Sequence, residues 1–331
     1  MSNNLPRGFY KTTPESFVVQ EVIKSIPPRP PWPVEFSKQS IVLGWKGDPY
    51  TIFTLSKSGW SAEKAMREVA RQLDVSFADI SAHGLKDKQA CTSQHIGVRG
   101  NFCPYFSHQD MSLVQLHGQN SPLFIGDIEG NRFDITILSQ AESIDETAIV
   151  AVPNLFGPQR LGKHEGSEQV GRLFLEGRPE EAIEQILTIP PAADKFLEVQ
   201  ELTGGSWEEV LSHPEYQFSF KFEIQKWQSY LWNKFVQEQM EKLGSNTPNM
   251  LPLWNPSKRI FEMYKHLWNP SQLNQKVLKF INEKDRPTML RPKYFRAKRT
   301  IGGWNFKFDL PPGAYATVVL EKLFRLEERR V

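Results

Sequence analysis

A charged turn followed by polar residues occupies residues 83–98, HGLKDKQACTSQHIGV. Asp87 stands between two lysines, Lys86 and Lys88. If those cations lie close in space, they favour the ionised carboxylate. An ionised aspartate in a loop can act as a nucleophile or as a base. A solvated charged turn also produces this tripeptide, so the pattern alone assigns no activity.

A second charged feature is the basic strip from Lys284 to Arg299, KDRPTMLRPKYFRAKR, with seven cations and one anion. Its net charge is +6, whereas the whole chain carries only +2. Cations interleaved with Tyr294 and Phe295 suit phosphate neutralisation combined with base stacking. A solvated surface segment explains the same run equally well, so both interpretations stay open.

Common cofactor and metal motifs are missing from the sequence. It contains no GxxxxGK[ST] phosphate loop, no GxGxxG fingerprint and no HExxH motif. Cys91 and Cys103 do not form a CxxC pair, and the 7 histidines are scattered along the chain. We therefore expect chemistry that uses neither a metal ion nor a nucleotide cofactor.

Length and composition place the chain among soluble globular proteins. Its 331 residues suit two domains, and 39% hydrophobic with 24% charged residues is ordinary for a folded protein. No apolar run approaches the roughly 20 residues that a membrane span needs. The N-terminus resembles no signal peptide, and two cysteines cannot build a disulfide scaffold. We expect a cytoplasmic protein that does not cross a membrane.

Hydrophobic periodicity predicts the elements that must position these residues. Strands are expected at residues 15–23, 50–55, 94–98 and 131–138. Ser61 is expected to cap a helix that ends near Leu73. From Val152 onward the pattern is helical, with a break near residues 177–179, and the chain ends as a strand, a Pro/Gly turn and a final helix.

Three segments are less regular. PPRPPWP at residues 27–33 predicts an extended connector, either packed on the protein or serving as a ligand for a proline-binding module. Residues 216–224, YQFSFKFEI, alternate like a strand but lead into a helical pattern. The related LWNPSK and LWNPSQ, at 253–258 and 267–272, predict two helices with Asn caps and Pro in the first turn.

Six segments in order resemble the TruD family of tRNA pseudouridine synthases. They are YKTTPESFVVQE (10–21), GLKDKQACTSQ (84–94), GNRF (130–133), VPNLFGPQRLG (152–162), WQSYLWN (227–233) and LPPGAYATVVLEKL (310–323). The resemblance implies an α+β fold, in which a catalytic domain with a mixed, largely antiparallel sheet and a central cleft is interrupted by a family-specific α/β insertion domain. We expect catalytic residues 1–151, an insertion at 152–300 and a closing strand and helix at 301–331. The resemblance also favours a helix at 216–224.

The resemblance implies site residues as well. Asp87 falls on the catalytic aspartate of the motif G-x-K-D-x-x-A-x-T-x-Q. Lys11 falls on the lysine before the family's P-E-x-F strand and is expected to pair with Asp87, although an exposed lysine beside a strand is the plain alternative. Asn131 and Phe133 fall on the N-x-F motif, where Phe133 would lie against the target base or simply pack in the core. The expected RNA contacts are Arg160, Arg291, Lys293, Arg296, Lys298 and Arg299. For Arg160, fastening the domain junction is an equal alternative to contacting phosphate.

The implied activity is the isomerisation of a uridine in tRNA, expected at position 13, to pseudouridine on a nucleotide flipped out of its stack. We expect tRNA as the partner, no cofactor, no obligatory protein partner and a monomer. Asp87 can attack C1′, attack the ring or remove a sugar proton, and the sequence does not choose. The alternatives are a non-catalytic RNA-binding or RNA-chaperone protein using the same cleft and strip, or an unrelated metal-free hydrolase, for which no second catalytic group stands at a recognisable spacing.

Overall fold

The computed structural model describes residues 5–23, 48–84, 86, 90–102, 106–108, 110–124, 128–162, 164, 166–190 and 192–328. Asp87 and the proline-rich segment at residues 27–33 lie outside the described residues. Contacts within the chain define two units. Unit 1 contains residues 1–151 and 291–331, and unit 2 contains residues 152–290.

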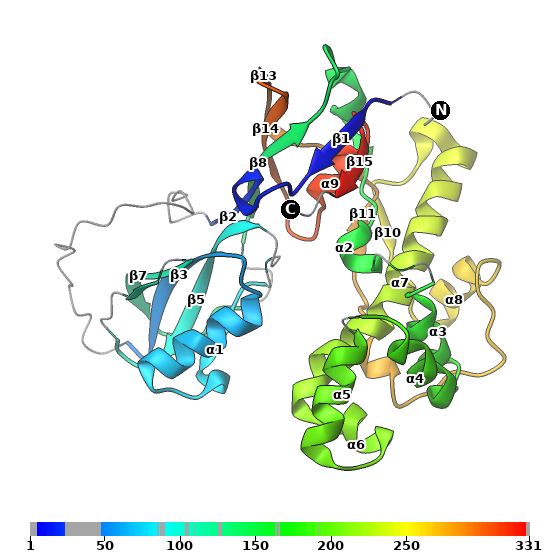
Figure 1. The fold of residues 1–331 in the computed structure, drawn as a ribbon. Helices are drawn as coiled ribbons and strands as arrows, with labels where there is room; N and C mark the ends of the chain where they lie inside the picture. Colours follow the sequence, from blue (N-terminus) through cyan, green and yellow to red (C-terminus); the bar gives the residue numbers. More distant parts are fainter. Residues whose placement is uncertain are drawn as a thin grey trace. The chain divides into compact units, whose positions relative to one another are not determined.

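Unit 1 is built on one mixed sheet, which has eleven strands among the described residues (Figure 1). The strands are β1 (Arg7–Tyr10), β2 (Phe17–Val22), β3 (Tyr50–Ser58), β4 (Ile80–Ala82), β5 (Cys91–Arg99), β6 (Phe106–His108), β7 (Met111–Gln119), β8 (Gly130–Leu138), β13 (Lys293–Thr300), β14 (Gly303–Leu310) and β15 (Arg325–Glu328). Their order is β13-β14-β8-β2-β5-β3-β7-β6, with β1 on β8, β15 on β1 and β4 on β5. Only β1–β15 and β2–β5 are parallel among the described pairs. The largely antiparallel sheet confirms the predicted α+β class.

Helix α1 (Ala62–Leu73) begins where the sequence predicts. The Ser61 side chain accepts a hydrogen bond from the Lys64 backbone N–H at 3.2 Å, which satisfies one of the unpaired donors of the first turn. Figure 1 shows α1 lying along β3 and β5. Its face of Ala65, Met66 and Val69 packs on apolar side chains of these strands. The capped helix therefore covers one part of the sheet.

The C-terminal segment ends differently from the expectation. A short helix, α9 (Ala316–Leu320), follows β14, but the chain then continues into β15, which pairs in parallel with β1. Phe324, just before β15, meets Phe306 of β14 edge-on, with ring centroids 5.8 Å apart. Three short 3-10 helices complete the regular structure of unit 1 in the described residues, at Pro14–Ser16, Phe77–Asp79 and Glu146–Ile149.

Unit 2 is helical, with two short antiparallel strand pairs, β10–β11 and β9–β12. Its helices are α2 (Pro158–Leu161), α3 (Gln169–Leu175), α4 (Pro179–Leu187), α5 (Ala192–Thr203), α6 (Trp207–Ser212), α7 (Pro214–Leu243) and α8 (Lys258–Tyr264), with 3-10 turns at Gly244–Asn246 and Leu278–Phe280. The strands are β9 (Val152–Pro153), β10 (Met250–Pro252), β11 (Asp285–Pro287) and β12 (Met289–Leu290). Residues 291–300, expected in the insertion, lie instead in unit 1, because β13 pairs with β14.

Residues 216–224 are helical and form part of α7. Tyr216, Phe220 and Ile224 are buried at a spacing of four residues, while Phe218 is 58% exposed. The strand-like alternation of residues 216–224 therefore does not indicate a strand. The side chains that pack in the core of unit 2 are four residues apart, which is the spacing of one face of a helix.

The duplicated LWNPS motif starts one α-helix, not two. In the first copy the residue before α8 is Ser257, and Asn255 Oδ1 accepts a hydrogen bond from the Ser257 backbone N–H at 3.0 Å. The second copy leads only to the 3-10 turn Leu278–Phe280. There the Asn274 backbone N–H donates to the carbonyl oxygen of Leu175 at 2.8 Å. The segment is therefore hydrogen-bonded to the end of α3 and does not form an α-helix of its own.

Candidate functional site

Three neighbouring strands of unit 1 place the N-x-F residues on one side of the sheet. Phe133 of β8 pairs with Val19 of β2 and with Phe308 of β14. Asn131 pairs with Glu21 and lies two residues away on the same strand. Directly paired residues project from the same face, and side chains alternate between faces along a strand. Asn131, Phe133 and Glu21 therefore share a face, which we call the Phe133 face.

The rings on the Phe133 face form a continuous cluster. Phe133, which is 6% exposed, stacks on Phe308 with centroids 5.6 Å apart, and meets Phe17 edge-on at 6.4 Å. Lys11 Nζ lies 5.0 Å from the centroid of the Phe17 ring. Lys11 also has a φ of 54°, a left-handed backbone conformation that is uncommon outside glycine. The structure thus brings Lys11 and Phe133 together through Phe17.

Asn131 offers a buried hydrogen-bond acceptor on the same face. Its Oδ1 atom is shielded from solvent and has no hydrogen-bond partner among the described residues. Leaving such an oxygen unpaired costs about 1–3 kcal/mol. A ligand that brings a donor to this atom would recover that free energy.

Glu21 is the charged centre of the Phe133 face. Its carboxylate Oε1 lies 2.8 Å from Lys86 Nζ, in the charged turn. Its Oε2 accepts a hydrogen bond from the His95 backbone N–H at 2.8 Å and lies 3.2 Å from Nδ1 of the same residue. Burial opposes ionisation of Glu21, but the bonds from His95 and the charge of Lys86 outweigh it, so the pKa of Glu21 lies below its usual value.

Two further contacts hold the start of the charged turn. Lys57 of β3 is 1% exposed, and its Nζ donates to the carbonyl oxygens of Trp60 at 2.8 Å and Lys86 at 3.4 Å. His83 is also buried, with Nδ1 2.9 Å from the carbonyl oxygen of Phe124. Asp87 is the next residue after Lys86 but lies outside the described residues, so its expected pairing with Lys11 stays a prediction.

Lys293, Arg296 and Lys298 of β13 do not share the Phe133 face, whereas Arg299 pairs with Trp304 of that face. Arg296 pairs with Lys307 and Lys298 pairs with Asn305 across β13 and β14. Lys307 in turn pairs with Asp134, the neighbour of Phe133 along β8, and its Nζ lies 2.8 Å from the Asp134 carboxylate. Because neighbouring residues in a strand point to opposite faces, Arg296 and Lys298 project from the other side of the sheet.

The remaining basic candidates differ in what they contact. Arg291 and Lys293 are exposed. Arg299 donates to the carbonyl oxygen of Gly303 at 3.0 Å and lies over the Trp304 ring. Arg160 of α2 donates to Ser229 Oγ at 3.2 Å and Gln225 Oε1 at 2.6 Å, both on α7 of unit 2. These bonds favour a packing role for Arg160. Arg286, another member of the basic strip, is buried and donates to Asn154 within unit 2.

Tyr294 is the exposed aromatic residue of the strip. It is 76% exposed and has a φ of 55°. The β13–β14 register shifts between Lys293 and Arg296, so Tyr294 lies in a bulge. Its neighbour Phe295 points the other way and stacks on Phe308 with centroids 5.8 Å apart. The bulge therefore sends one ring into the Phe133 face and the other into solvent.

Glu21 and Lys57 were not among the residues singled out in the sequence. A signal for Glu21 was nevertheless present, since Phe17, Val19 and Glu21 occupy alternate positions of an amphipathic strand and all three are buried. A charged residue at a buried position requires a partner. The sequence offers no comparable signal for Lys57, which lies in a mostly buried strand.

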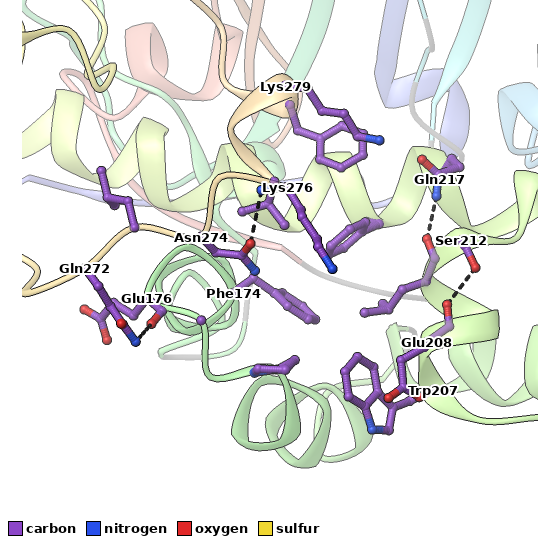
Figure 2. A pocket seen from close by; sticks show the side chains of 17 residues that line it. Phe174, Glu176, Trp207, Glu208, Ser212, Gln217, Gln272, Asn274, Lys276 and Lys279 are labelled. Atoms are coloured by element: carbon purple, nitrogen blue, oxygen red, sulfur yellow. Dashed lines mark hydrogen bonds between the residues drawn. The ribbon is translucent and has the colours of Figure 1, made fainter.

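Unit 2 contains a separate cavity of about 750 Å³ (Figure 2). Lys276, Trp207 and Phe174 are among the side chains that line it. None of the site residues predicted from the sequence lines this cavity. Among the described residues, no helix is long and apolar enough to span a membrane, and no cluster of three or more His, Cys, Asp or Glu side chains could hold a metal ion.

Comparison with known proteins shows the family of the chain. A family model described as tRNA pseudouridine synthase D (TruD) matches residues 6–218. The chain is 25% identical over 414 aligned positions to "Probable tRNA pseudouridine synthase D" of Pyrococcus furiosus, covering 96% of this chain and 95% of that protein. It is 26% identical over 352 positions to the protein of the same name from Methanopyrus kandleri, covering 86% and 88%. The crystal structure titled "Putative tRNA pseudouridine synthase D (TruD)" from Methanosarcina mazei has the same fold, with a TM-score of 0.54 at 20% identity over 97% of this chain and 94% of that one.

The fold and the matched motifs define a protein of the pseudouridine synthase class. Because the family model covers more than half of the chain, the chain belongs to the tRNA pseudouridine synthase D (TruD) family.

Proposed function

We propose that this chain isomerises one uridine of tRNA, expected at position 13, to pseudouridine, with Asp87 as the catalytic carboxylate. Membership of the tRNA pseudouridine synthase D family supports the reaction class. The observation that carries the location of the site is the ion pair between Glu21 and Lys86, which joins the Phe133 face to the residue that precedes Asp87. We expect the chain to act as a monomer in the cytoplasm, without a cofactor.

The reaction balances without any co-reactant. The bond between C1′ and N1 breaks and a bond between C1′ and C5 forms, while C5 loses a hydrogen and N1 gains one. Asp87 acts in this exchange by attacking C1′, by attacking the ring or by removing a sugar proton. The nucleotide must leave its stack, because both edges of the base and the sugar have to be reached.

The side chains on the Phe133 face suit the uracil base. In this proposal the base lies against Phe133 and the rings around it, where stacking contributes on the order of 1–3 kcal/mol. Asn131 Oδ1, which lacks a partner among the described residues, accepts a hydrogen bond from the N3–H of uracil. Lys11 lies beside Phe17 at the same cluster and supplies a positive charge near the reacting group.

Arg291 and the cations of β13 bind the tRNA backbone in this proposal, with the exposed Arg291, Lys293, Arg296 and Lys298 as the main phosphate contacts. Because β13 is an edge strand of the sheet in the described part of the chain, RNA can pass around it and meet both faces. Arg299 and Arg160 already donate to protein groups, so their contribution to RNA binding is smaller.

The proposal is tested on total tRNA from cells that lack this protein. The purified chain is incubated with that RNA, and pseudouridine is mapped at single-nucleotide resolution. We expect pseudouridine to appear at one uridine position with the wild-type chain and at none with Asp87→Asn. Tight tRNA binding without any new pseudouridine would favour the non-catalytic RNA-binding alternative.

A further inference from the structure

We infer that Glu21 is a positioning residue, which holds Lys86 and thereby places Asp87, the next residue along the chain. This inference rests on the proposed function. Glu21 lies on β2, and Lys86 lies 65 residues later, between β4 and β5. Their ion pair is therefore a tertiary anchor and not a contact between neighbours in the sequence.

The burial of the pair argues for a role in placement. Glu21 is 3% exposed, and the Lys86 side chain is 10% exposed. Removing two charges from water is costly, and apolar residues of similar size often stabilise a core equally well or better. The neighbours of this ion pair on the same face, Phe17, Val19 and Phe133, are apolar. The pair therefore contributes more to fixing the position of Lys86 than to the stability of the fold.

A second, independent anchor acts on the same residue. Lys57 Nζ reaches the Lys86 carbonyl oxygen from β3, on the opposite side of β5 from β2 in the strand order. The side chain and the backbone of residue 86 are therefore held from two different strands. Glu21 is also paired with Asn131 in the β2–β8 ladder, so the anchor lies beside the proposed contact to the base.

This arrangement predicts which kinetic parameter depends on Glu21. Nucleophilic or proton-transfer chemistry needs reacting atoms within about 3–3.5 Å, and a misplacement of about 1 Å can cost a factor of 100. Glu21 itself faces Lys86 and His95, so it does not meet the RNA backbone in this scheme. Its loss should therefore slow the chemical step and leave tRNA affinity unchanged.

The test compares Glu21→Gln with the wild-type chain in single-turnover reactions at saturating protein. Glutamine keeps an acceptor for the His95 N–H but removes the charge that holds Lys86. We expect the rate constant to fall by about 10- to 100-fold, with the dissociation constant for tRNA unchanged. Lys86→Met should reproduce the loss, Lys86→Arg should restore part of the rate, and the double variant should be no slower than the slower single variant.

Glu327→Gln is the matched control, because it breaks the Arg7–Glu327 ion pair of the same unit, far along the chain from the turn. Its rate should equal that of the wild type. Circular dichroism establishes that each variant is folded at the assay temperature. If Glu21→Gln does not fold, the single-turnover rate of Lys86→Met tests the inference in its place. Wild-type rates in folded Glu21→Gln and Lys86→Met would overturn the inference alone. An inactive wild-type chain would overturn the proposed function and the inference together.

Discussion

Glu21 and Lys86 form a buried ion pair, with the carboxylate oxygen and the ammonium nitrogen 2.8 Å apart. This one contact links the strand that begins with Phe17 to Lys86, the residue before Asp87. It also explains how motif segments that are far apart in sequence, near residues 10–21, 84–94 and 130–133, can serve one site in unit 1.

The depressed pKa of Glu21 predicts an acid-sensitive contribution to stability. A carboxylate whose pKa is lower in the folded than in the unfolded state binds fewer protons when folded, so its stabilisation is present at neutral pH and is lost as pH falls through the folded-state pKa. Glu21→Gln should lower the free energy of unfolding at pH 7 by about 3 kcal/mol. The difference from wild type, measured by urea denaturation, should stay constant above the usual glutamate pKa of 4.5 and shrink as pH falls below it. A difference independent of pH would contradict this account.

The aromatic ring of Phe133 should contribute to turnover in addition to its contribution to core packing. Phe133→Leu keeps an apolar side chain of similar volume, with an expected stability loss below about 1.5 kcal/mol, but removes the flat ring. We expect turnover at saturating tRNA to fall by about tenfold, which corresponds to about 1.4 kcal/mol of lost stacking.

Phe306→Leu is the control for this change, because Phe306 is a fully buried phenylalanine on the same face of neighbouring β14, away from the N-x-F motif. It should lose similar stability and keep its turnover. Equal losses of turnover in both variants would assign Phe133 to the core only.

The cations of β13 should control affinity and not chemistry. Replacing Lys293, Arg296 and Lys298 together by Ala should weaken tRNA binding and reduce the slope of log K against log salt by about 0.9 for each lost duplex phosphate contact. Turnover at saturating tRNA should stay close to wild type, because the Phe133 face is on the other side of the sheet.

The control for charge alone replaces three exposed lysines of unit 2, Lys242, Lys265 and Lys276. This variant should keep the wild-type salt slope. If the β13 variant binds tRNA with the affinity and salt slope of the parent, the strip is a solvated surface.

Tyr294 should contribute to RNA binding by stacking. Tyr294→Ala should lower affinity for tRNA by about tenfold, corresponding to about 1.4 kcal/mol, without changing the salt slope, since a stacked ring releases few counterions. Tyr294→Phe keeps the ring and should bind as the wild type does. Equal binding by the Ala and Phe variants in fluorescence titrations would show that the exposed ring makes no contact.

The parts of the fold that the sequence predicts are those with local signals. The Ser61 cap and the apolar spacing of the following residues predict α1, and alternating apolar residues predict β8. The four residues of β15, RLEE, lack such a pattern, because this strand is held by its pairing with β1 and not by a buried face. The second LWNPS copy has good helix signals, yet the bond from Asn274 to Leu175 prevails over them.

The candidate site shows the same division. The motif residues Asn131 and Phe133 can be named from sequence, and the strand register then shows that they share a face with Glu21. The direction of the β13 cations depends on the bulge between Lys293 and Arg296 and on their pairing with β14, neither of which has a sequence signal here. The partner of Glu21 likewise depends on tertiary structure, because Lys86 is distant in sequence.

The most direct test of the central claim is pseudouridine mapping of tRNA treated with the Asp87→Asn chain. Asparagine matches aspartate in shape but lacks its charge and nucleophilicity, so the variant should fold and bind tRNA as the wild type does. The account predicts that the wild-type chain converts one uridine position to pseudouridine and that Asp87→Asn converts none. Full conversion by Asp87→Asn at the wild-type rate would contradict it.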